Sequence, residues 1–330
     1  METRLCPATD DAIADAVRLL QSGELVAVPT ETVYGLAAHA FLPEAVLSVF
    51  AAKERPSFDP LIAHVLPTEL DALCEVVDLS RLKTAARQRA TALTTLWPGP
   101  LTLVLPKGEK IPDHATSGFD TVAVRSPSHP VMRALLRGLG APVVAPSANR
   151  FGRISPTRAS HVADELSGRI PLILDGGPTD HGIESTIVGV EDDGTLRLLR
   201  PGSLPVEEIK KVAGAPLRAA EGPARAPGML ASHYAPRIPL VCAPSAEETD
   251  GPVAWLVFDS DAPPDAARFG KPVAIERLGS DDRRAAQHLF AALRRLDGSG
   301  AAWILAETPR DQGGLWPALR DRLARAAATR

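Results

Sequence analysis

The sequence predicts an α/β protein with two domains, and three observations support this expectation. Short apolar runs that suit buried strands alternate with segments of helical periodicity from about residue 10 to residue 200. A stretch rich in proline, glycine and alanine follows, and a second, shorter alternation of the same kind comes after it. With 330 residues, the chain is long enough for about two domains.

The first domain is expected over residues 1–205, as a twisted mixed sheet with flanking helices. Apolar residues recur at helical spacing after the N-cap candidate Thr9, and LVAV at 25–28 is typical of a buried strand. The other expected strands are 61–65, 101–105, 121–125, 143–147, 172–175, 185–190 and 196–200. The other expected helices lie near 43–53, 80–96, 128–139 and 157–167.

Residues 206–238 are expected to form a linker. The segment begins with one short helical pattern, PVEEIKKVAG, and then loses all periodicity. Residues 239–330 are expected to form a smaller, Rossmann-like α/β domain. Its expected strands are 253–258, 272–278 and 301–307, and its expected helices are 281–295 and 313–327.

Composition argues against several classes of protein. The net charge of -4 does not suit binding to nucleic-acid phosphates over a broad surface, although a local basic cleft is compatible with it. The cysteines Cys6, Cys74 and Cys242 stand far apart, without the spacing of a zinc site or a disulfide framework. The sequence lacks an apolar run of about 18 residues and a basic, apolar leader, so a cytoplasmic protein without membrane contact is expected.

Short polar side chains follow several of the expected strands. The strand at 25–28 runs into PTETVYG, and the later strands run into RSPSHP, SANRFGRISPT and GGPTDHGIEST. Ligands of α/β sheets gather beyond the carboxyl ends of strands, so these loops are expected to share one cleft. Local turn formation explains any single loop equally well. In the first loop, Gly35 is expected to turn the chain back toward a helix.

Three basic residues are candidates for anion binding. Lys53 and Arg55 lie at the end of a helical pattern, where they suit either a polyphosphate or the helix dipole. Arg125 ends the apolar run TVAV, so it requires either the carboxylate of a ligand or a structural acid. His64, within LIAHV, suits a hydrogen-bonded core position better than a general base.

Asp175 and Glu184 form a weaker candidate, as a carboxylate pair for acid–base chemistry or for Mg²⁺. Acids beside glycine are also ordinary turn formers. The sequence has no GxxxxGK[ST], GxGxxG, HExxH or GxSxG motif. A nucleotide site, if present, must therefore be of another kind.

Taken together, eight segments in order resemble the YrdC-like family in its long form, the threonylcarbamoyl-AMP synthases. They are PTETVYGLAAHA, KERPSFDPL, WPGPLTLVLP, VAVRSPSHP, APVVAPSANRFGRISPT, ILDGGPTDHGIESTIV, LLRPGSL and APGMLASHYAP. The resemblance covers about residues 10–237, and the long form has an accessory domain where residues 239–330 lie.

The resemblance implies a reaction of L-threonine, bicarbonate or CO₂, and ATP. A carbamate oxygen attacks the α-phosphate, which gives threonylcarbamoyl-AMP and pyrophosphate. A tRNA threonylcarbamoyl transferase complex would then use this adenylate beside the anticodon, so direct tRNA binding is expected to be weak or absent. Mg²⁺ is expected to arrive with ATP rather than to be held by protein ligands.

The resemblance also implies site residues. Thr32, His64, Arg125 and Ser185 match positions around L-threonine. Lys53, Arg55, Asp59, Thr121, Ser147, Asn149, Ser155, Arg200 and Tyr234 match positions around ATP, with Lys53 and Arg55 as the catalytic candidates.

Three further expectations concern the linker and two departures from the family pattern. The linker is expected to act as a lid, because His233 and Tyr234 carry chemistry that a spacer does not need. Asp59 stands where the family commonly has Asn, which implies either a Mg²⁺ contact or a lost hydrogen bond. Leu230 stands where many relatives have Lys.

Two alternatives to this function come from the same sequence. One is a synthase of another carbamoyl adenylate, although the CxxC pairs of the larger carbamoyl-transfer maturases are missing. The other is a non-catalytic RNA-binding module that uses Lys53 and Arg55 on phosphates. An aromatic content of 4% and the negative net charge do not favour that module.

Overall fold

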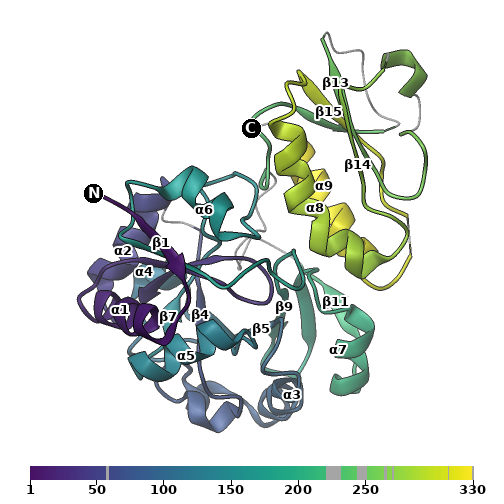
Figure 1. Ribbon diagram of the computed structural model, residues 1–330. Helices are drawn as coiled ribbons and strands as arrows, with labels where there is room; N and C mark the ends of the chain where they lie inside the picture. Colours follow the sequence, from purple (N-terminus) through teal and green to yellow (C-terminus); the bar gives the residue numbers. More distant parts are fainter. Residues whose placement is uncertain are drawn as a thin grey trace.

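Two α/β units make up the computed structural model. It describes residues 1–56, 59–220, 232–243, 251–263, 266–269, 271–310 and 312–328. The large unit carries the first part of the chain and the small unit the last part, at the upper right of Figure 1. Within the described residues, no helix is both long and apolar enough to span a membrane.

The large unit is built on one mixed sheet. Over the described residues the strand order is β1-β8-β2-β3-β7-β4-β6-β5-β9-β10-β11. The bounds are β1 (Arg4–Pro7), β2 (Val26–Val28), β3 (Gly35–His39), β4 (Ile62–His64), β5 (Leu101–Pro106), β6 (Thr121–Arg125), β7 (Val143–Val144), β8 (Leu172–Asp175), β9 (Thr186–Val190), β10 (Leu196–Arg200) and β11 (Leu217–Ala219). Parallel pairs such as β4 with β6 alternate with antiparallel pairs such as β5 with β6.

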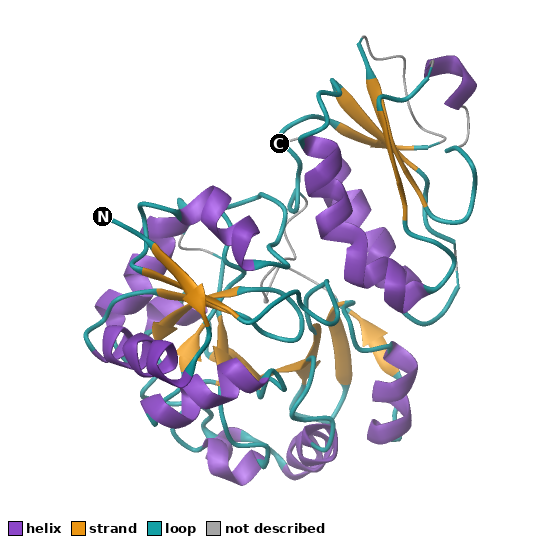
Figure 2. Cartoon of the chain, viewed as in Figure 1, coloured by secondary structure: helices purple, strands orange, loops and turns teal. Residues whose placement is uncertain are grey.

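Helices flank this sheet, as Figure 2 shows. They are α1 (Asp10–Gln21), α2 (Pro43–Lys53), α3 (Thr84–Thr94), α4 (Asp113–Thr116), α5 (Pro130–Leu139), α6 (Ala159–Leu166) and α7 (Val206–Ala213). The first helix begins where the sequence predicts, because the Thr9 side chain accepts a hydrogen bond from the Ala12 amide. Its buried residues Ala16 and Leu20 pack with Leu135 of α5 in one apolar cluster.

The small unit has a parallel sheet in the order β12-β15-β13-β14. These strands are β12 (Leu240–Cys242), β13 (Val253–Val257), β14 (Ala274–Arg277) and β15 (Trp303–Ala306). Its two long helices, α8 (Asp282–Asp297) and α9 (Trp316–Ala327), cover the face of the sheet that is turned toward the large unit (Figure 1). Both helices therefore stand between the small sheet and the large unit.

The predicted α/β class, mixed sheet and flanking helices are confirmed, but local details differ. Gly35 does not turn the chain toward a helix: it is the first residue of β3 and pairs with Val28. The strand expected at 143–147 is only two residues long. The large sheet continues through β11 at 217–219, so it extends into the segment expected to be a linker.

Candidate active site

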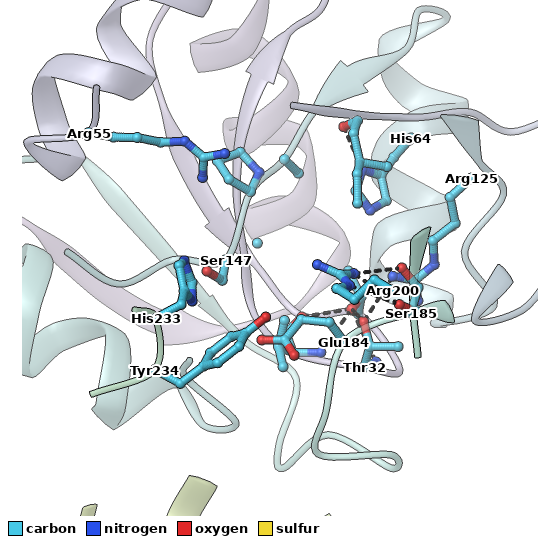
Figure 3. Close-up of a pocket in the computed structure, with 16 residues that line it drawn as sticks. Thr32, Arg55, His64, Arg125, Ser147, Glu184, Ser185, Arg200, His233 and Tyr234 are labelled. Atoms are coloured by element: carbon cyan, nitrogen blue, oxygen red, sulfur yellow. Dashed lines mark hydrogen bonds between the residues drawn. The ribbon is translucent and has the colours of Figure 1, made fainter. Parts of the chain in front are cut away.

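A cavity lies where several strands of the large sheet end, as Figure 3 shows. It is lined by Thr30, Thr32, Val33, Gly35, Arg55, Ile62, His64, Arg125, Ala145, Pro146, Ser147, Glu184, Ser185, Arg200, His233 and Tyr234. Each of the four polar loops that follow the predicted strands contributes at least one residue to this lining. The hypothesis of one shared cleft is therefore confirmed.

Hydroxyl groups in the loop after β2 hold that loop together. The Thr30 hydroxyl donates to the Val33 carbonyl at 2.6 Å and lies 2.8 Å from the Thr32 hydroxyl. It also accepts hydrogen bonds from the amides of Thr32 and Val33. These bonds give the loop one conformation and turn Thr32 toward the cavity.

Arg125 forms a buried ion pair with Glu31. Its Nη2 lies 2.7 Å from the Glu31 Oε1, and both side chains are 3% exposed. Its Nη1 donates to the Thr32 hydroxyl at 2.9 Å. Burial raises the pKa of Glu31, but Arg125 and the Ser128 amide outweigh this and bring the pKa to about 2. The sequence left open whether a ligand or a protein acid meets Arg125, and the structure supplies the protein acid.

His64 is a neutral hydrogen-bonding group in this site. Burial and the nearby charge of Arg125 lower its pKa to about 3. Its Nδ1 lies 3.2 Å from the Ile62 carbonyl, which can only accept, so Nδ1 carries the proton. The Nε2 atom is consequently an acceptor for a hydroxyl or an amine.

Arg200 and Ser185 meet at the ends of neighbouring strands. Arg200 Nη2 donates to the Ser185 carbonyl at 2.9 Å and lies 3.2 Å from its hydroxyl. The same hydroxyl lies 2.8 Å from that of Thr102. Sheet pairing of β9 with β10 thus brings together two residues that the family resemblance assigns to different substrates.

Arg55 lines the cavity and is paired with Asp59. Its Nη2 lies 2.9 Å from the Asp59 Oδ2 and donates to the carbonyls of Asp59 and Pro60. Burial raises the pKa of Asp59 despite the opposing effect of Arg55. Because this chain has Asp59 where the family commonly has Asn, a carboxylate lies against Arg55, the cation expected to contact the phosphates of ATP.

Five predicted site residues do not line this cavity. They are Lys53, Asp59, Thr121, Asn149 and Ser155. Lys53, which is 1% exposed, donates to the carbonyls of Ser147 and Asn149, and so it holds the loop that carries Ser147. Burial, with Arg55 nearby, lowers the Lys53 pKa to about 7. A direct contact of any of the five with ATP stays a prediction.

Asp175 and Glu184 do not form the carboxylate pair considered from the sequence. Asp175 accepts from the Gly177 amide at 2.9 Å in a turn, which is the ordinary role for an acid beside glycine. Glu184 lines the cavity instead, and its Oε1 accepts from the Ser155 hydroxyl at 2.5 Å. The prediction that Glu184 pairs with Asp175 is therefore wrong, although Glu184 itself lies in the cavity lining.

His233 and Tyr234 form the wall opposite His64 and Arg125 (Figure 3). Tyr234 has a φ of 64°, a left-handed conformation that is uncommon outside glycine. The expected lid at 206–238 is described only in part, because residues 221–231, including Leu230, lie outside the described residues. Lid motion stays a prediction.

Comparison with known proteins identifies relatives for both units. A family model described as telomere recombination matches residues 18–202, and a model described as the C-terminal domain of threonylcarbamoyl-AMP synthase matches residues 204–328. The threonylcarbamoyl-AMP synthase of Bacillus subtilis (strain 168) is 40% identical, with 97% of this chain and 94% of that protein covered. The enzyme of the same name from Pyrococcus abyssi (strain GE5 / Orsay) is 39% identical over 96% of this chain and 94% of that protein.

A solved structure is similar across both units. The crystal structure of P. abyssi Sua5 complexed with L-threonine superposes with a TM-score of 0.83 at 36% identity, over 96% of this chain and 94% of that one. Fold, cavity and matches define the class: this is an enzyme with a YrdC-like domain. More particularly, the chain belongs to the long, two-domain form of the YrdC-like family, the form shared with the named threonylcarbamoyl-AMP synthases.

The ion pair of Arg125 with Glu31 predicts a specific pH dependence of stability. Folding lowers the Glu31 pKa from 4.5 to about 2, so the pair stabilises the fold above pH 4.5 and loses this effect as the pH falls toward 2. We expect Glu31→Gln to lower the free energy of unfolding by about 3 kcal/mol at pH 7, and by much less near pH 3. Urea unfolding at several pH values measures this difference.

The exposed Glu44→Gln at the start of α2 is the matched control for loss of one carboxylate. It should change the free energy of unfolding by less than about 0.5 kcal/mol. A destabilisation by Glu31→Gln that stays constant from pH 7 to pH 3 would contradict the assignment of the pH dependence to this pair.

Proposed function

We propose that this protein synthesises threonylcarbamoyl-AMP from L-threonine, bicarbonate or CO₂, and ATP, with release of pyrophosphate. The carrying observation is the cavity itself, in which Arg125, His64 and Ser185 lie at one end and Arg55 and Tyr234 at the other. Such a cavity suits a small polar amino acid beside a nucleotide. Its relatives over nearly the full chain carry the name of this activity.

The end of the cavity near Arg125 would take L-threonine. Neutral His64 accepts a hydrogen bond through Nε2, which suits the hydroxyl or the amine of the substrate. Thr32 and Ser185 add hydroxyl groups to this part of the lining. Because Glu31 already balances the charge of Arg125, the remaining N–H groups of that guanidinium would orient the substrate carboxylate rather than supply a net charge.

The other end would hold ATP. Arg55 brings positive charge to the phosphates at this end, and Ser147 and Tyr234 bring hydroxyl groups. Arg200, which contacts Ser185, would meet the phosphates from the threonine end. A carbamate oxygen attacks the α-phosphorus, the bond to the bridging oxygen breaks, and pyrophosphate leaves with the electron pair. Because the AMP group passes from ATP to the carbamate, the enzyme would be a nucleotidyltransferase. Catalysis of such a step rests on alignment of the reactants and on stabilisation of phosphoryl charge.

Mg²⁺ would accompany the phosphates. Among the described residues, no group of three or more His, Cys, Asp or Glu side chains is arranged to hold a metal ion. The carboxylate of Glu184, which lines the cavity, and those of Asp59 and Glu31 each face an arginine. We propose that the metal is carried by ATP and that the protein acts in the cytoplasm. A downstream tRNA-modifying transferase would consume the labile product.

The direct test incubates the purified protein with Mg-ATP, bicarbonate and L-threonine. We expect pyrophosphate release that requires both bicarbonate and threonine, and a labile adenylate of the corresponding mass in rapid mass spectrometry. L-serine is the matched control, because the methyl group of threonine is worth roughly 1–3 kcal/mol in an apolar pocket. ATP binding without any threonine-dependent pyrophosphate would contradict the proposed function.

The pair of Arg55 with Asp59 yields a second prediction. Asp59→Asn keeps a hydrogen-bond acceptor beside Arg55 but removes the negative charge of the carboxylate. More of the positive charge of Arg55 then acts on the phosphates. We expect the KM for ATP to fall roughly 3- to 10-fold, about the effect of one buried charge pair. Arg55→Ala in the Asp59→Asn background should abolish this gain. A higher KM in Asp59→Asn would show that the carboxylate assists ATP binding.

A further inference from the structure

Arg322 belongs to the small unit but makes hydrogen bonds to two residues of the large one. It lies on α9 and is fully buried, at 0% exposure. Its Nε donates to the Glu184 Oε2 at 2.8 Å, and its Nη1 donates to the Pro201 carbonyl at 2.9 Å. The Asp321 carboxylate accepts a further hydrogen bond from Nη1 at 2.7 Å. Arg322 does not itself line the cavity.

Glu184 is the cavity residue that Arg322 controls most directly. Its two oxygens are held separately, one by Ser155 and the other by Arg322. Burial raises the pKa of Glu184, but Arg322 and Arg200 together outweigh burial and lower it, so the carboxylate is ionised. An ionised carboxylate in the lining repels a polyphosphate unless a fixed cation balances it.

Tyr234 is the second cavity residue beside Arg322. The Arg322 Cζ lies 5.2 Å from the centroid of the Tyr234 ring, within the range of a cation–π contact. Phe290 of α8 stacks against the same ring at 5.4 Å between centroids. The adjacent His233 amide donates to the Arg325 carbonyl of α9 at 3.1 Å. Figure 3 shows Tyr234 and Glu184 next to each other at one side of the cavity.

We propose that Arg322 is a positioning residue through which the small unit prepares the nucleotide end of the cavity. It balances the charge of Glu184, fixes that carboxylate between α9 and Ser155, and supports the ring of Tyr234. The inference rests on the proposed function, because it requires a polyanionic substrate. It also gives the small unit a defined part in the reaction.

The test uses the full chain in five forms: wild type, Arg322→Met, Glu184→Gln, the double variant, and the control Arg283→Met. Methionine keeps an unbranched side chain against the Tyr234 ring and removes only the charge and the hydrogen bonds. Arg283 of α8 pairs with Glu208 of α7 at 3.4 Å and is 73% exposed, so the control removes another ion pair between the units away from the cavity. Calorimetric ATP affinity, KM, kcat and thermal unfolding are measured for each form.

We expect Arg322→Met to weaken ATP binding and raise the KM for ATP roughly 10- to 100-fold, with a smaller change in kcat. In the double variant, where no carboxylate is left uncompensated, ATP affinity should return to within about 3-fold of that of Glu184→Gln. Arg283→Met should bind ATP like the wild type. Where Arg322→Met alone fails to fold, the comparison of Glu184→Gln with the double variant carries the test.

Two results would overturn the inference. One is an Arg322→Met protein with wild-type ATP affinity, and the other is a double variant that binds ATP much more weakly than Glu184→Gln. ATP affinity is measured without turnover. A wild-type protein that binds ATP but releases no pyrophosphate would therefore refute the proposed function, while the ATP affinities of the variants would still test the role of Arg322. A wild type that binds no ATP would refute both.

Discussion

The pairing of buried arginines with carboxylates is the constraint on which this site depends. A guanidinium removed from water is costly unless a hydrogen-bonded anion or a set of carbonyl groups meets it. Arg125 meets Glu31, Arg55 meets Asp59, and Arg322 meets Glu184. A scaffold that fixes both partners of each pair is needed to keep these charges buried in and beside the cavity.

The mixed sheet provides that fixation. Parallel pairing of β4 with β6 sets His64 directly beside Arg125, and antiparallel pairing of β9 with β10 sets Arg200 near Ser185. The loop after β2 brings Thr32 to the same point through its internal hydroxyl bonds. His64, Arg125 and Arg200 therefore occupy their positions because of strand register, and a shift by one residue would turn them away from the cavity.

Much of this could be predicted from the sequence, since apolar runs and strand exits are local signals. The helix capped by Thr9, the helix that begins at Asp282 and the loops that share the cavity follow from such patterns. The partners of the charges could not be predicted, because Glu31 meets Arg125 across 94 residues and Arg322 meets Glu184 across 138. The strand β3 was missed for a related reason: Gly35 looks like a turn residue until its register with Val28 is known.

The contact of α9 with two residues of the cavity wall has a consequence for protein synthesis. Among the described residues, the strands of the large sheet all precede residue 220, whereas α9 spans Trp316–Ala327. On the ribosome, the large unit can form its sheet while the helix that supports Tyr234 and Glu184 is still inside the exit tunnel. A newly made chain thus acquires a folded scaffold first and its complete cavity wall only after α9 has also emerged.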